Sequence, residues 1–275
     1  MGVDYLIDHP CKVKDTLSGD RMIAMIKQRN RGLAIINLMA TDGMSEADAL
    51  NSMIKVQALD GTHQEMRKVS EVLHDTSCLD QLQVNCKSCP ASHGEPFGCY
   101  RWISYPLSAK AEDWLAYLSK KSAVKGPPRS KSLIFIQEQE LDGGRVTGMR
   151  TSGPEYFEIR KPRKIVVGGT PFNLKYVNTD QVLNLLFGFE RVKSAHALML
   201  LHLSGGLTLQ DKEPARGSYE FLTKKTDETG EIKWFVYNLP EAPSDDLSTR
   251  NLKEYFKAIF IAYKLDDDLL VNLVS

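Results

Sequence analysis

Cysteine is scarce in this chain, long apolar runs are missing, and neither sign of charge is in excess. No apolar run approaches the roughly 18 to 20 residues that a helix needs to cross a bilayer. Basic and acidic residues are equal at 35 each, so no overall field draws the chain towards nucleic acid or an anionic membrane. These absences exclude an integral membrane protein of the helical kind and a strongly basic nucleic-acid binder.

A secretory leader is also missing from the residues given. The first residues, MGVDYLIDHPC, contain no basic segment followed by an apolar stretch, so we expect no signal peptide. This predicts a cytoplasmic protein, whose thiols stay reduced. In that compartment a cysteine cluster binds a metal more often than it forms disulfides.

The familiar catalytic motifs do not occur either. The chain has no Gly-x-Ser-x-Gly, no His-Glu-x-x-His and no P-loop pattern. Cys11 has His9 nearby, but nothing in the sequence supplies the third group that would orient this pair as a nucleophile and its base. Whether the chain is an enzyme stays open, and the pattern favours a protein that is not one.

The cysteines that are present are concentrated. Four of the five lie in one window with the spacing C-x7-C-x2-C-x9-C: Cys78, Cys86, Cys89 and Cys99. A Cys-x2-Cys pair lets two thiolates reach one ion from a single turn, and two flanking cysteines complete a tetrahedral shell. The window therefore predicts a four-cysteine metal site, with Zn²⁺ as the first choice of metal.

Three alternatives stay open for this window. A [4Fe-4S] cluster also uses four thiolates, and the window resembles the four-cysteine loop of the endonuclease III-like DNA glycosylases, which has a Cys-x2-Cys in its middle. The resemblance covers this loop alone, with longer outer spacings here, and it implies an iron–sulfur protein that acts on nucleic acid. His93 lies inside the window and could replace one thiolate. Finally, the cysteines could be unligated thiols.

Aromatic and basic residues surround the same window. Rings stack on bases and cations bind phosphates, so a surface for single-stranded nucleic acid is a second interpretation of the segment. The residues concerned are Lys87, Phe97, Tyr100, Arg101, Trp102 and Tyr105. The neutral overall charge does not favour this interpretation, because nucleic-acid binding depends mainly on contacts to phosphate.

The chain changes character at a basic, proline-containing stretch. Residues 123–131 hold Gly126, Pro127 and Pro128 among basic residues, with no acid, and we expect a linker there. The prediction is α+β: a helical N-terminal domain, residues 1–122, that carries the four-cysteine metal loop, and an α+β domain with antiparallel hairpins, residues 132–275.

Hydrophobic periodicity gives the expected elements. Helices are predicted over 62–74, 179–203 and 248–263, because apolar residues recur there at intervals of three and four. Turn residues predict hairpins around 142–144 and 227–230. The function predicted from all of this is an intracellular, metal-stabilised binding or adaptor protein that acts through protein–protein contacts. The alternative is an iron–sulfur protein acting on nucleic acid, or an enzyme with no recognisable motif.

Overall fold

The computed structural model describes residues 2–59, 63–93, 97–121, 136, 141–170, 173–214, 221–226 and 230–272. Helices account for 48% and strands for 22% of the structure, and the sheets are antiparallel. This confirms the α+β class. The chain forms two compact units, one made of residues 1–8 with 101–275 and the other of residues 9–100.

The larger unit, residues 1–8 and 101–275, is built on a four-stranded sheet with the order β4-β1-β11-β7. All six residues of β1 (Gly2–Ile7) are buried, which marks it as a central strand. Its antiparallel partner β11 (Leu269–Asn272) comes from the other end of the chain. The outer strands are β4 (Tyr100–Ser104) and β7 (Arg191–Val192).

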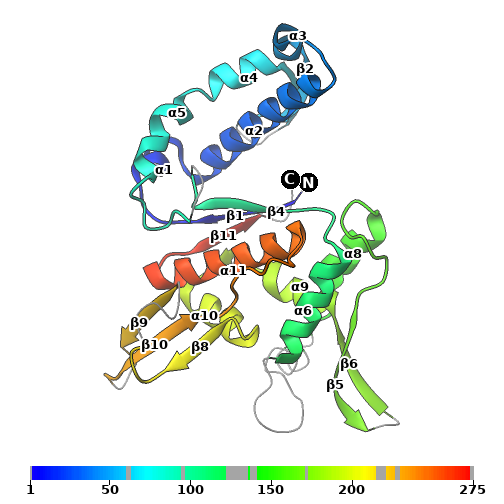
Figure 1. Cartoon of the computed structure of the whole chain (residues 1–275), viewed down its shortest axis with the longest axis vertical. Helices are drawn as coiled ribbons and strands as arrows, with labels where there is room; N and C mark the ends of the chain where they lie inside the picture. Colours follow the sequence, from blue (N-terminus) through cyan, green and yellow to red (C-terminus); the bar gives the residue numbers. More distant parts are fainter. Residues whose placement is uncertain are drawn as a thin grey trace. The chain divides into compact units, whose positions relative to one another are not determined.

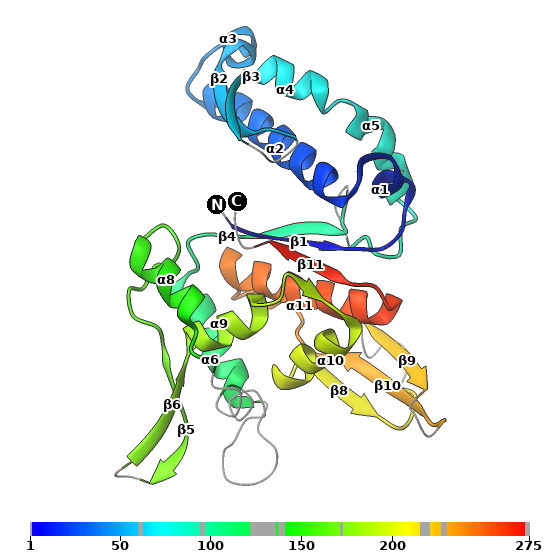
Figure 2. The same ribbon diagram turned by 180° about the vertical axis from the view of Figure 1, so that it is seen from behind.

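One long helix, α11 (Leu247–Leu265), packs against this sheet in both views (Figure 1, Figure 2). Eleven of its nineteen residues are buried, so it forms the centre of the apolar core. The other helices of the unit are α6 (Ala109–Lys121), α8 (Gly144–Ser152), α9 (Thr179–Phe187) and α10 (Ser194–Leu203).

Two further sheets complete the larger unit. A three-stranded sheet has the order β8-β10-β9, with strands β8 (Leu207–Gln210), β10 (Ile232–Tyr237) and β9 (Leu222–Thr226). The strands on either side of the predicted turn at 227–230 are paired antiparallel, and residues 227–229 themselves lie outside the described residues. The strands β5 (Lys164–Thr170) and β6 (Asn173–Asn178) form a hairpin that extends away from the helices of this unit (Figure 1, Figure 2).

The smaller unit, residues 9–100, is mainly helical. Its long helix α2 (Gly19–Thr41) packs against α4 (Val69–Asp75), and a small apolar core lies under the hairpin β2 (Met53–Gln57) and β3 (Gln64–Lys68). Its other elements are α1 (Lys12–Leu17), α3 (Glu46–Asn51), α5 (Cys78–Gln83) and the short 3-10 helix η1 (Val84–Cys86).

Several predictions of local structure were wrong. The predicted helix over 62–74 is strand β3 followed by helix α4, and the predicted hairpin at 142–144 is the start of helix α8. The predicted helix over 179–203 is two helices separated by strand β7.

The unit boundaries also differ from the predicted division at 123–131. Strand β1 and residues 101–121 belong to the larger unit, because β1 pairs with the C-terminal strand β11. The predicted linker itself, 123–131, lies outside the described residues.

Candidate cysteine site and a buried polar network

The four cysteines of the window occupy different local structures. Cys78 is the first residue of α5, and Cys86 is the last residue of η1. The backbone N–H of Cys89 donates to the carbonyl oxygen of Cys86 at 3.2 Å, which closes the turn that the Cys-x2-Cys spacing predicted. Cys99 directly precedes strand β4.

Sheet topology brings the chain near Cys11, the cysteine outside the window, towards the chain near Cys99. Strands β1 and β4 are neighbours in the sheet, and a Cβ atom added at Gly2 would lie 2.4 Å from the carbonyl oxygen of Ile103. The start of β1 therefore lies beside the end of β4, so the two strands are antiparallel and the end of β1 lies beside the start of β4. Cys11, four residues after β1, and Cys99, one residue before β4, leave the sheet at the same end.

The pKa of the Cys99 thiol reflects its burial and its charged neighbours. Burial, with smaller contributions from Cys89, Cys86 and Cys11, raises this pKa to about 12 against the lowering effect of Lys14. We call these four residues the cysteine group: Cys11, Cys86, Cys89 and Cys99. Cys78 is not among the charges that chiefly set the pKa of Cys86 or Cys99.

Cys86 has a similar environment and one additional contact. Burial raises the pKa of its thiol, the neighbouring Cys11 and Cys89 raise it further, and a hydrogen bond from the backbone N–H of Phe97 lowers it. Phe97 is a buried residue with a φ of 58°, a left-handed conformation that non-glycine residues seldom adopt. The loop backbone is therefore bent so that an N–H group points at a cysteine sulfur.

The chemistry that these thiols support follows from their protonation. All five cysteines are free thiols. Raised pKa values keep Cys86 and Cys99 protonated near neutral pH, and a protonated thiol is a poor nucleophile. The arrangement thus gives no support to nucleophilic catalysis by these two residues.

The predicted metal loop of Cys78, Cys86, Cys89 and Cys99 is not shown. Among the described residues, no group of three or more His, Cys, Asp or Glu side chains is arranged so that it could hold a metal ion. His93, the predicted substitute ligand, lies in the same loop, where its backbone N–H donates to the carbonyl oxygen of Gly98 at 3.5 Å. The place of Cys11 was missed because it depends on the pairing of β1 with β4, which local sequence patterns do not reveal.

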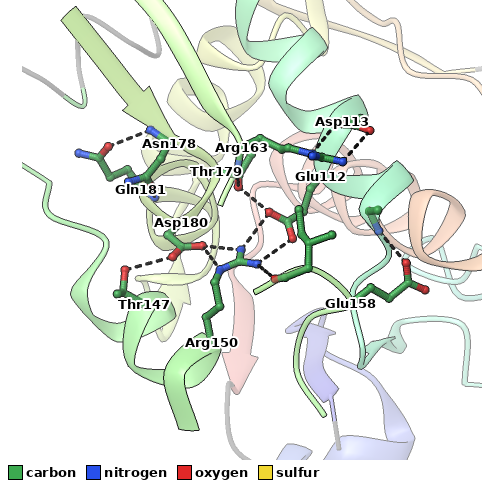
Figure 3. A network of polar contacts seen from close by, with 12 residues as sticks. Glu112, Asp113, Thr147, Arg150, Glu158, Arg163, Asn178, Thr179, Asp180 and Gln181 are labelled. Atoms are coloured by element: carbon green, nitrogen blue, oxygen red, sulfur yellow. Dashed lines mark hydrogen bonds and ion pairs between the residues drawn. The ribbon is translucent and has the colours of Figure 1, made fainter. Parts of the chain in front are cut away.

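A second polar feature, in the larger unit, is a buried network around Arg150 (Figure 3). Its guanidinium group binds Glu112 through two hydrogen bonds of 3.0 and 2.9 Å and Asp180 through two of 2.9 and 2.5 Å. A fifth bond of 2.6 Å reaches the carbonyl oxygen of Ile159. All five N–H groups of the arginine thus have acceptors.

The two carboxylates of the network are also well supplied with donors. The hydroxyl of Thr179 donates to Glu112 at 2.5 Å, and the hydroxyl of Thr147 donates to Asp180 at 3.1 Å. The side chains of Glu112 and Asp180 are fully buried and that of Arg150 is 2% exposed. Burial alone would lower the pKa of Arg150, but the hydrogen bonds to Asp180 and Glu112 raise it.

This network ties together helices α6, α8 and α9 and the segment that precedes β5. Since the arginine has no free donor and the group is sealed from solvent, nothing in it is left to bind a substrate. Its role is structural. No sequence pattern indicated this network, because its three charged members are distant in the chain and lie in elements with no common pattern.

Acidic pH should weaken the start of α11, where Asp246 caps the helix. Its carboxylate accepts hydrogen bonds from the hydroxyl of Ser108 at 2.6 Å and the backbone N–H of Thr249 at 2.8 Å. Burial raises the pKa of Asp246, but these hydrogen bonds lower it more, so the folded value lies below the ordinary one. A lowered folded pKa stabilises the fold above the unfolded value of about 3.9, and this contribution is lost as the pH falls through the folded pKa.

The substitution Asp246→Asn tests this contribution, because asparagine also caps helices well and the change isolates the charge. We expect the variant to be less stable than the parent at pH 6 and the difference to shrink towards pH 3. Urea unfolding between pH 6 and pH 3 gives the free energy of unfolding of each protein. A difference between the two proteins that does not change with pH would show that the charge of Asp246 makes no such contribution.

Comparison with protein-family models, with curated proteins and with solved structures found no match to this chain. No helix in the described part of the chain has both the length and the hydropathy needed to cross a membrane. The functional argument therefore depends on the residues and their geometry.

Proposed function

We propose that this chain is a binding protein that acts through contacts with another protein, and that the β5–β6 hairpin is its contact surface. The observation that supports the proposal is the exposure of three large apolar side chains on this hairpin. Val166 is 46% exposed, Leu174 is 40% and Tyr176 is 49%. Contiguous apolar surface of this kind commonly marks an interaction site.

The strand register puts these side chains on one face. Val166 pairs directly with Tyr176, and Leu174 lies two residues from Tyr176, so the three side chains point the same way. The pair Ile165 and Val177 points to the opposite face, where both residues are almost fully buried. At Ile165 and Val177 the hairpin is thus packed in the interior of the larger unit, while Val166, Leu174 and Tyr176 stay exposed.

The charge of the hairpin indicates what the partner is like. The two strand sequences contain Lys164 and Lys175 and no acidic residue. Lys164 is exposed, and its ammonium group lies 5.7 Å from the centre of the Tyr176 ring, on the same face. An apolar face that carries Lys164 is complementary to an apolar protein surface bordered by acidic side chains, because such a rim attracts this lysine during association.

The substitution Tyr176→Asp tests the proposal. It puts a charge in the middle of the exposed face and should abolish recovery of the partner, since aromatic side chains are often the residues on which an interface depends. The measurement is quantitative mass spectrometry of proteins that copurify with the full-length chain. The substitution should change the free energy of unfolding by no more than about 0.5 kcal/mol, because the side chain is exposed.

The matched control is Leu209→Asp. Leu209 is 54% exposed on strand β8, which belongs to a different sheet, so the same change there should leave the copurifying proteins as they are in the parent. Equal recovery by the Tyr176→Asp protein and the parent would contradict the proposal. Recovery that disappears after nuclease treatment would instead favour the nucleic-acid alternative.

A further inference from the structure

Two members of the cysteine group, Cys86 and Cys89, lie in two consecutive turns of the smaller unit. Cys86 ends the 3-10 helix η1, and the backbone N–H of Cys89 donates to the carbonyl oxygen of Cys86 at 3.2 Å. In the next turn the backbone N–H of Ser92 donates to the carbonyl oxygen of Cys89 at 3.0 Å. Pro90 takes the second position of this turn, where its ring presets the φ that the turn needs. Local hydrogen bonds therefore fix the backbone at both cysteines.

The turn between the two cysteines brings their thiols within reach of each other. The first and last Cα atoms of such a four-residue turn lie less than about 7 Å apart. A disulfide spans Cα separations of about 4.4–6.8 Å, and both cysteines are free thiols in this structure. We propose that Cys86 and Cys89 form a redox-active dithiol, which is converted to a disulfide by exchange with a small-molecule disulfide such as oxidised glutathione.

Exposure assigns different roles to the two thiols. Cys89 is partly exposed, whereas Cys86 is buried, with 7% of its surface exposed. Only an exposed thiol can reach a disulfide in solution, so Cys89 reacts first and Cys86 second. Burial also raises the pKa of the Cys86 thiol, which keeps this thiol protonated and unreactive towards external disulfides near neutral pH.

The exchange takes place in two steps. In the first, the Cys89 thiolate attacks one sulfur of oxidised glutathione, so that a mixed disulfide forms on Cys89 and one glutathione thiolate leaves as the glutathione S–S bond breaks. In the second, Cys86 loses its proton and its sulfur attacks the sulfur of Cys89, which forms the protein disulfide and releases the second glutathione thiolate. The two glutathione thiolates take up the protons that the two cysteines release. Two protein thiols are thus oxidised to one disulfide, and one glutathione disulfide is reduced to two thiols.

The second step does not need an exposed Cys86. It is intramolecular, and a short turn that fixes both residues gives Cys86 a high effective concentration beside the mixed disulfide. A thiol with a raised pKa is also intrinsically more nucleophilic once it is deprotonated, which partly offsets the small fraction of thiolate.

Trypsin offers a direct test, because Lys87 lies between the two cysteines. Cleavage there separates Cys86, in peptide 69–87, from Cys89, in peptide 88–101. The full-length parent is incubated with oxidised glutathione, its remaining thiols are alkylated with iodoacetamide in denaturant, and the digest is read by tandem mass spectrometry. We expect the two peptides to be joined through Cys86 and Cys89. Two of the five thiols should then resist alkylation until dithiothreitol is added.

Substitutions separate the two roles. Cys86→Ser should stop after the first step and keep glutathione on Cys89, whereas Cys89→Ser should form no disulfide at Cys86. Cys78→Ser is the matched control, since Cys78 belongs to the same window and is also partly exposed but lies in α5, outside the turn. This variant should form the disulfide as the parent does.

The measurement on the parent decides the proposal even where a variant does not fold. A digest without joined peptides, a disulfide that uses Cys11, Cys78 or Cys99, or glutathione that stays on Cys89 of the parent would overturn it. The β5–β6 hairpin belongs to the larger unit and takes no part in these reactions, so this proposal and the proposed function fail separately.

Discussion

Replacing Arg150 with methionine is expected to lower the free energy of unfolding of the larger unit by about 3–5 kcal/mol. The change leaves the carboxylates of Glu112 and Asp180 fully buried without the cation that binds both of them. Removing one partner of a buried ion pair costs this much because the remaining charges keep their desolvation penalty and lose the attraction that offset it. Loss of the contact between the guanidinium group and the ring of Phe157, at 3.9 Å, adds to the effect.

Tryptophan fluorescence during urea unfolding measures this effect in the right part of the chain. The three tryptophans are Trp102, Trp114 and Trp234, and all of them lie in the larger unit. The matched control is Arg163→Met, which removes an ion pair to Asp113 whose side chains are 42% and 60% exposed. Such a surface pair contributes no more than about 1 kcal/mol. A similar decrease in the free energy of unfolding in the two variants would mean that the buried Arg150 network stabilises the unit no more than the exposed ion pair does.

Truncation of Phe256 to alanine is expected to lower the free energy of unfolding of the same unit by about 3–5 kcal/mol. Phe256 is fully buried on α11 and makes edge-to-face contacts with Trp114 at 6.0 Å and with Tyr255 at 6.3 Å between ring centres. Its loss leaves a cavity beside the rings of Trp114 and Tyr255. The surrounding rings cannot collapse into the space without breaking their own contacts. The loss of stability should therefore exceed the transfer free energy of the removed phenyl group, because the energy of the remaining cavity is added to it.

The control for this truncation is Tyr117→Ala on α6. Tyr117 is also aromatic but is 60% exposed, and its truncation should change the free energy of unfolding by no more than about 0.5 kcal/mol. Urea unfolding followed by tryptophan fluorescence and by circular dichroism compares the two variants. A loss under 1 kcal/mol for Phe256→Ala would contradict the central position of α11 in the core.

Elements with a strong local pattern could be predicted from the sequence. Helix α11 was expected over 248–263 and extends over Leu247–Leu265, because apolar residues follow the helical period throughout it. A hairpin around 227–230 was expected for a similar local reason, and its second strand is β10 as predicted, whereas its first strand, β9, lies closer to 227–230 than the sequence pattern indicated. In both cases the residues that define the element are near neighbours in the chain.

Elements whose pattern is short or ambiguous could not be predicted in this way. Strand β3 alternates between exposed and partly buried residues, and its one apolar residue, Met66, fits the helical period of α4 directly after it. Its identity as a strand is decided by pairing with β2, which supplies backbone hydrogen-bond partners that the isolated segment does not have. Helix α8 likewise makes a buried contact that is distant in sequence, between Arg150 and Asp180.

By itself the sequence determined the α+β class, the Cys86–Cys89 turn and the long helix α11, because these depend on residue spacing over one or two turns of chain. Tertiary structure alone decided that β1 belongs with the C-terminal strand, that Arg150 meets two buried carboxylates, and that the chain before Cys11 and the chain after Cys99 lie in neighbouring strands. Each of these contacts joins residues far apart in the chain. They form only when burial of the shared apolar core offsets the entropy of closing the long loops between them, and no local pattern records that balance.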